Sequence, residues 1–111
     1  MDKEMMKGSI DLLILALLAQ EDMYGYDIAK RIKKESNHLY KMSEGTLYPA
    51  LKRLEGKGYL VSYWQETKAG KKRKYYSLTE NGKELYKQKV EEWQKVNALV
   101  VRVTTRGRLL V

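Results

Sequence analysis

The side chains with the clearest chemical potential are the cations of a short stretch in the second half of the chain. They are Lys68, Lys71, Lys72, Arg73 and Lys74, and no Asp or Glu lies between positions 67 and 79. Clustered ammonium and guanidinium groups neutralise phosphate, although charge runs also occur on ordinary hydrated surfaces. The segment therefore indicates an anionic partner, provided that the fold holds it out from the body.

A second group of polar side chains lies between positions 46 and 53. Thr46 and Tyr48 carry hydroxyl groups, and Lys52 and Arg53 carry positive charge. Hydroxyl groups hydrogen-bond base edges or phosphates, and cations neutralise phosphates. The alternative is that these are hydrated positions on a surface helix, so their meaning depends on the element that carries them.

Catalytic chemistry finds little support in the sequence. His38 is the single histidine, there is no cysteine, and no nucleophile–base pair, phosphate-binding loop or metal-ligand spacing is visible. The missing cysteine removes disulfides, thiolate catalysis and thiolate metal sites together. We expect a protein that is not an enzyme and that needs neither a metal ion nor a cofactor.

Charge and hydropathy bound the class of protein. The chain has 111 residues, enough for one domain, and 22 Lys and Arg against 14 Asp and Glu give a net charge of +8. Such a surplus favours nucleic acid or an anionic membrane surface. The longest apolar run, Ile10–Ala19, is interrupted by Asp11 and is far shorter than the roughly 20 residues that span a bilayer. The basic segment that follows has an apolar stripe too narrow for membrane insertion, so we expect a cytoplasmic location and no membrane partner.

Hydrophobic periodicity predicts three short helices in the first half of the chain. Ile10–Ala19 is apolar on nearly all sides, which requires cover from several directions and favours a partner subunit. Tyr24–Ser36 has a basic outer face. The third helix is expected over Thr46–Lys57, with an irregular lead-in from Ser43, because Pro49 fits best in the first turn of a helix.

Two strands and a long helix complete the predicted order. Aromatic and β-branched residues predict strands over 59–66 and 73–78, joined by a turn that contains Gly70. Ser9 and Thr79 are expected to cap the first and last helices, and the last helix continues to Gly107. The fold class is mainly α with a small β-hairpin. It combines a winged helix-turn-helix DNA-binding domain over 1–79 with a long C-terminal dimerisation helix and short basic tail over 80–111, as one compact domain overall.

This order gives the polar residues a common role. In a helix-turn-helix the second helix of the pair enters the major groove, and Thr46–Lys57 would hold that place here. The cationic turn would lie beside it, where it suits minor-groove or backbone contact. Tyr26 adds a hydroxyl at a helix N-terminus, a position that binds phosphate; the alternative is that it packs against the first helix.

Three separated segments resemble the PadR family of transcriptional regulators, in its short-chain subfamily. They are Tyr24–Ile28, Gly45–Glu55 and Arg73–Gly82, within a resemblance that covers about residues 7–103. The resemblance implies DNA contacts from the third helix and the wing, carried over to Ser43, Thr46, Tyr48, Lys52 and 72–75. With the candidates from the residues themselves, the predicted DNA-binding set is Tyr26, Ser43, Thr46, Tyr48, Lys52, Arg53, Lys71, Lys72, Arg73, Lys74 and Tyr75.

The resemblance also implies a homodimer bound to a two-fold symmetric operator in double-stranded DNA. The last helix of one subunit would pack against the first helix of its partner. The predicted interface residues are Ile10, Leu13, Leu17, Tyr86, Val90, Trp93, Val96, Val100 and Val103. Many members of this family are repressors that a small molecule, often aromatic, releases from DNA.

Some short-chain members bind flat aromatic compounds against a tryptophan of the last helix, and Trp93 holds the matching position. The candidate effector-binding residues are Leu13, Ala16, Trp93, Val96 and Val100, with Ser9 as a further wall. Stacking between two symmetry-related tryptophans suits a planar ligand. The alternative is that Trp93 only packs the dimer interface. For the whole chain, the alternative function is a winged-helix protein–protein interaction module, with its basic wing on an acidic protein surface.

Overall fold

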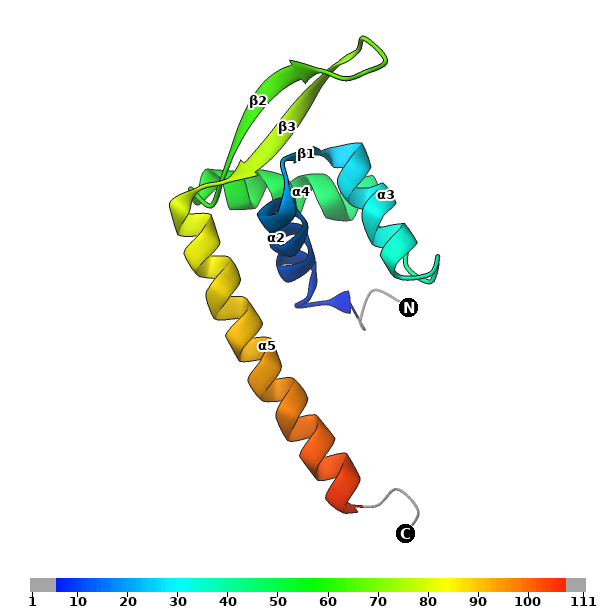
Figure 1. Cartoon of the computed structure of the whole chain (residues 1–111), viewed down its shortest axis with the longest axis vertical. Coiled ribbons are helices and arrows are strands. Elements are labelled where there is room, and N and C mark those ends of the chain that lie inside the picture. The colour runs from blue at the N-terminus through cyan, green and yellow to red at the C-terminus, as the bar shows by residue number, and fades with distance from the viewer. Residues whose placement is uncertain (1–5, 108–111) are drawn as a thin grey trace.

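The computed structural model describes residues 6–107, in which the predicted helices and strands follow one another in the predicted order, with one additional short strand between the first two predicted helices (Figure 1). The basic tail Arg106–Val111 is expected from the sequence to fray, but Arg106 and Gly107 are the last residues of the final helix, and residues 108–111 lie outside the described range. The elements are α2 (Ile10–Gln20), β1 (Met23–Tyr24), α3 (Gly25–Glu35), α4 (Glu44–Gly56), β2 (Leu60–Glu66), β3 (Lys72–Leu78) and α5 (Glu80–Gly107).

The core forms where α2, α3 and α4 meet beneath the sheet. From α2 come Ile14 and Leu15, from α3 Ile28, and from α4 Leu51, each with no exposed surface. Removing one such side chain costs about 2–5 kcal/mol. The buried side chains of the described range are aliphatic apart from Tyr40 and Tyr76, and none is charged, so apolar packing dominates this small core.

The sheet has three antiparallel strands in the order β1-β3-β2. The expected hairpin of β2 and β3 is confirmed, with Leu60 opposite Leu78 and Glu66 opposite Lys72. The predicted helix Tyr24–Ser36 begins one residue later, because Tyr24 and Met23 before it form β1 and pair with β3. A two-residue strand has no periodicity of its own, so only its partner strand reveals it.

Two predicted helix starts need correction. Ser43 is the N-cap of α4, and its hydroxyl accepts a hydrogen bond from the Thr46 amide at 3.2 Å, so the helix begins at Glu44 without an irregular lead-in. Pro49 therefore lies inside the helix. The carbonyl that Pro49 leaves without a backbone donor belongs to Gly45, which is exposed, so solvent can reach it. Ser9 holds the N-cap position of α2, but its side chain makes no capping bond.

Helix α5 starts on the body and then leaves it. The Thr79 hydroxyl accepts a hydrogen bond from the Gly82 amide at 3.0 Å, which confirms the expected cap. A Cβ at Gly82 would collide with the backbone carbonyl oxygen of Tyr59, so glycine permits this close approach. In Figure 1 the C-terminal half of this 28-residue helix projects away from the other elements. Among the described residues no helix is long and apolar enough to cross a membrane.

Candidate nucleic-acid interface

Helix α4 presents a shallow outer face with one cation at its centre. Its apolar residues are buried against the core, so the opposite side faces solvent. Helical spacing places Gly45, Pro49 and Lys52 on that outer side. Tyr48 lies on one flank of this outer side, whereas Thr46 and Arg53 lie on the other flank. Because the residues beside the exposed lysine are small, this side of α4 can enter the groove of a nucleic-acid duplex closely.

Tyr48 is fixed in place by the helix that precedes α4. A Cβ at Gly25 would lie 2.6 Å from the Tyr48 hydroxyl oxygen, so the tyrosine ring rests on the glycine backbone. Gly25 itself is buried, while 45% of Tyr48 stays exposed. The glycine between Tyr24 and Tyr26 thus lets α3 and α4 pack with a tyrosine between them, and part of the Tyr48 side chain stays exposed.

The wing carries the predicted cations on a hairpin that stands out from the body (Figure 1). Gly70 turns the chain at the tip with a φ of +84°, a left-handed conformation that other residues rarely adopt. Lys71, Lys72 and Arg73 are exposed there. Lys74 is partly buried, and its ammonium group lies 3.7 Å from the Glu55 carboxylate at the end of α4. The cations at the wing tip are therefore open to an anionic partner, and Lys74 helps to anchor the base of the hairpin.

Tyrosine rings brace the other face of the wing. The Tyr63 and Tyr75 rings stack with centroids 5.7 Å apart, and the Tyr75 and Tyr24 rings meet edge-on at 5.3 Å. The Tyr63 hydroxyl donates a hydrogen bond to Asp22 at 2.6 Å. That bond raises the pKa of Tyr63 to about 12, because the carboxylate favours the protonated phenol. Tyr75, predicted to contact DNA, thus has a clear structural role, and Arg73 lies with its guanidinium 5.8 Å from the Tyr24 ring.

Arg53 lies on the same flank of α4 as Thr46, but its side chain is held by α2. Its guanidinium donates two hydrogen bonds to the carboxylate of Asp11 on α2, at 2.6 and 2.9 Å. This two-point contact raises the pKa of Arg53, so its charge is fixed and compensated. The structure therefore separates Arg53 from Lys52, although they are neighbours in the sequence. Asp11 in the first turn of α2 is visible in the sequence, but its pairing with Arg53, 42 positions away, does not follow from residue spacing.

The predicted effector residues are brought together only in part. A groove of about 400 Å³ between α2 and α5 contains Leu13, Ala16 and Trp93 of the predicted set, together with Met6, Ser9, Leu12, Tyr86 and Val90. Val96 and Val100 lie further along α5 and do not line it. The lining is almost entirely apolar, which suits either a partner helix or a flat hydrophobic molecule.

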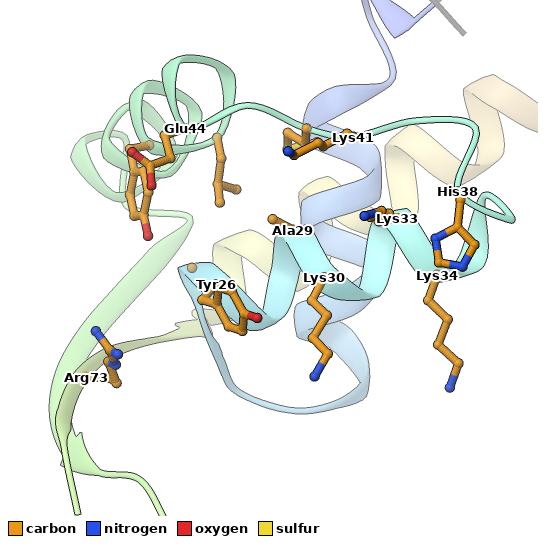
Figure 2. Close-up of a pocket in the computed structure, with 13 residues that line it drawn as sticks. Tyr26, Ala29, Lys30, Lys33, Lys34, His38, Lys41, Glu44 and Arg73 are labelled. Atoms are coloured by element: carbon orange, nitrogen blue, oxygen red, sulfur yellow. The ribbon is translucent and has the colours of Figure 1, made fainter. Parts of the chain in front are cut away.

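The site residues from α3, α4 and the wing are brought to one region. Tyr26 and Arg73 line the same groove between α3 and α4, with Tyr48 (Figure 2). An exposed helix in the second position of a helix-turn-helix, followed by a cationic hairpin, defines the class: a winged helix-turn-helix, a fold used to bind DNA.

Comparison with known proteins specifies the family. Residues 14–88 match the transcriptional regulator PadR-like family. The chain is 33% identical over 82 residues to the negative transcriptional regulator PadR of Bacillus subtilis, covering 72% of this chain and 42% of that protein. A transcriptional regulator from Clostridium thermocellum has 40% identity and a TM-score of 0.80, with 90% of this chain and 97% of that chain covered. A PadR family transcription regulator from Clostridium difficile has 38% identity and a TM-score of 0.74, with coverages of 86% and 97%.

The chain therefore belongs to the PadR-like family of transcriptional regulators. The relatives named above are regulators of transcription, not enzymes. Sequence reasoning predicted helix α4 and the wing hairpin, but it missed the Gly25–Tyr48 contact, the pairing of Arg53 and the groove between α3 and α4.

Proposed function

We propose that this protein is a cytoplasmic transcriptional repressor that binds a two-fold symmetric DNA operator as a homodimer. The observation that carries the proposal is the coincidence, on one winged-helix body, of an exposed helix α4 with a wing whose Lys71, Lys72 and Arg73 form no ion pair within residues 6–107. The name of the Bacillus subtilis relative describes a negative regulator, which supports repression rather than activation.

The dimer is supported by the apolar surface of α5. Trp93, Val96, Val100 and Val103 are each more than half exposed in the single chain. Helical spacing puts them on one side of α5, and the C-terminal half of this helix projects away from the other described elements (Figure 1). A second copy of α5, laid against the α2–α5 groove, buries these side chains and covers the remaining apolar flank of α2. The two-fold axis then presents two reading helices to one duplex.

The proposed DNA contacts divide by position. Lys52, with Thr46 and Tyr48 on its flanks, would face the major groove, and Ser43 lies at the N-terminus of the same helix. Lys71, Lys72 and Arg73 at the wing would neutralise phosphates of the adjacent backbone or minor groove. Arg53 is left out of this set because Asp11 holds its guanidinium.

The groove around Trp93 is the proposed effector site. It is apolar and lies where a partner subunit would close it, so a bound planar molecule would alter how the two subunits pack and release the operator. Its test uses a Trp64→Phe background in which Trp93 is the sole tryptophan. Quenching of Trp93 fluorescence by a flat aromatic compound, with loss of DNA affinity, is expected. If no aromatic compound changes the Trp93 fluorescence, Trp93 has no effector-binding role and only packs the dimer interface.

The DNA proposal is tested by selecting duplexes from a random pool at low salt and measuring affinity by fluorescence anisotropy. With about 6–10 phosphates neutralised per dimer, affinity is expected to fall about 10³- to 10⁵-fold between 50 and 200 mM salt. A Lys71→Ala, Lys72→Ala double variant is expected to flatten that dependence. A protein that retains no duplex at 50 mM salt contradicts the proposal and favours the alternative, an interaction module for acidic proteins.

A further inference from the structure

A basic groove lies beside the reading helix, between α3, α4 and the loop that joins them (Figure 2). Its volume is about 710 Å³. The floor includes Ala29, Met42 and Leu47, which are apolar. Its charged and titratable lining residues are Lys30, Lys33, Lys34, His38, Lys41, Glu44 and Arg73. One carboxylate thus faces five fixed positive charges, so the groove attracts anions strongly.

The cations come from three separate elements and are brought together by the fold. Lys33 lies on α3, Lys41 on the connecting loop and Arg73 on β3. Asn37 and His38 take left-handed backbone conformations, with φ of 54° and 65°, and reverse the chain after α3. That reversal returns the loop to the groove. In Figure 2, Arg73 and Tyr26 mark one end of the groove and His38 the other.

Within residues 6–107 these cations form no ion pair, and Glu44 is the one carboxylate among the lining residues. The ion pairs of that range involve Arg31, Arg53, Lys74 and Lys83, none of which lines the groove. Cations in the last turn of α3 stabilise the helix dipole, which accounts for Lys33 and Lys34. It does not account for Lys41 and Arg73, which lie on other elements. A ligand of negative charge explains the whole set.

We propose that this groove seats the sugar–phosphate backbone of DNA next to the major groove that α4 enters, an inference that rests on the proposed function. The groove is continuous with the proposed interface, because Tyr48 of α4 and Arg73 of the wing both line it. The apolar floor matches deoxyribose, and cations around the opening match successive phosphates. The footprint of each subunit therefore extends past the half-site to flanking backbone.

The test measures the salt dependence of binding to a selected duplex with long flanks. The double variant Lys33→Ala, Lys41→Ala removes one cation from α3 and one from the connecting loop, and leaves α4 and the wing intact. Loss of four phosphate contacts per dimer lowers the slope of log affinity against log salt by about 3–4. The control is Lys87→Ala, Lys95→Ala, which removes the same charge from exposed positions of α5. Ethylation interference on the same duplex locates the lost contacts.

The expected result is a reduced slope and loss of interference at flanking phosphates for the groove variant, with neither change in the control. Circular dichroism is expected to match the parent, since both substituted lysines are exposed. A groove variant that keeps the parental slope and interference pattern overturns the groove proposal and leaves the proposed function standing; an acidic protein would then be the groove's partner. A parent protein that binds no duplex overturns both.

Discussion

Replacing Val100 with Asp is the sharpest test of the apolar face of α5. Val100 is 52% exposed in the single chain, so a partner can bury about half of its surface. Full burial of a valine side chain contributes about 1.5–3 kcal/mol, so half contributes about 0.8–1.5 kcal/mol per chain. Two symmetry-related copies give about 1.5–3 kcal/mol, before any cost of burying the new carboxylate. Loss of the apolar contact alone is therefore expected to raise the dimer dissociation constant about 10- to 150-fold, and burial of the carboxylate raises it further.

Sedimentation velocity over a concentration series measures that constant, and Ala98→Asp is the matched control. It adds the same carboxylate to the same helix two positions earlier, about 200° around the helix axis and therefore on the opposite side. The control is expected to dimerise like the parent. If both variants dimerise equally well, or if only Ala98→Asp disrupts the dimer, the wrong side of α5 has been assigned to the interface.

Three further substitutions test other parts of the structure. Lys52→Ala is expected to lower the slope of log affinity against log salt by about 2 per dimer. Arg53→Ala is expected to leave that slope unchanged, because the Asp11 carboxylate already holds the Arg53 guanidinium. Anisotropy titrations at several salt concentrations compare the two variants, and equal slopes would contradict the assignment. Gly82→Ala is expected to lower the free energy of unfolding by about 1–3 kcal/mol or more, because the new Cβ meets a backbone carbonyl. The control, Gly56→Ala, places its Cβ in open space at the end of α4 and is expected to be neutral or stabilising. An unchanged Tm for Gly82→Ala would refute the contact. Tyr63→Phe is expected to lower the Tm near neutral pH. Because the folded pKa of Tyr63 is raised from 10.0 to about 12, its contribution is complete below pH 10 and lost as the pH rises to 12, so the Tm difference from the parent should shrink over that range; a constant difference would show that the hydrogen bond does not stabilise the fold.

The order of elements could be predicted from the sequence because each long element carries its own periodicity and its own caps. Thr79 was recognised as the N-cap of α5, and the buried face of α4 follows from the spacing of its leucines. The start of α4 was misplaced because the exposed outer side of the helix tolerates Pro49. Strand β1 was missed because it exists only through pairing with β3.

The candidate site was predictable only where function follows from one segment. The wing cations lie on consecutive positions, so their clustering is visible in the sequence. The bond between Arg53 and Asp11 joins residues 42 positions apart, and the groove combines lysines of α3 with Lys41 and Arg73. Such juxtapositions depend on packing angles and loop geometry, which residue spacing does not encode.

The stoichiometry on DNA is the most direct test that two copies read one operator. Native mass spectrometry of a selected duplex, titrated with the parent protein at low salt, measures how many chains each duplex holds. Free duplex and duplex with two chains are the species expected. A complex with a single chain that forms first and stays dominant as protein is added would contradict a paired reader held together by α5.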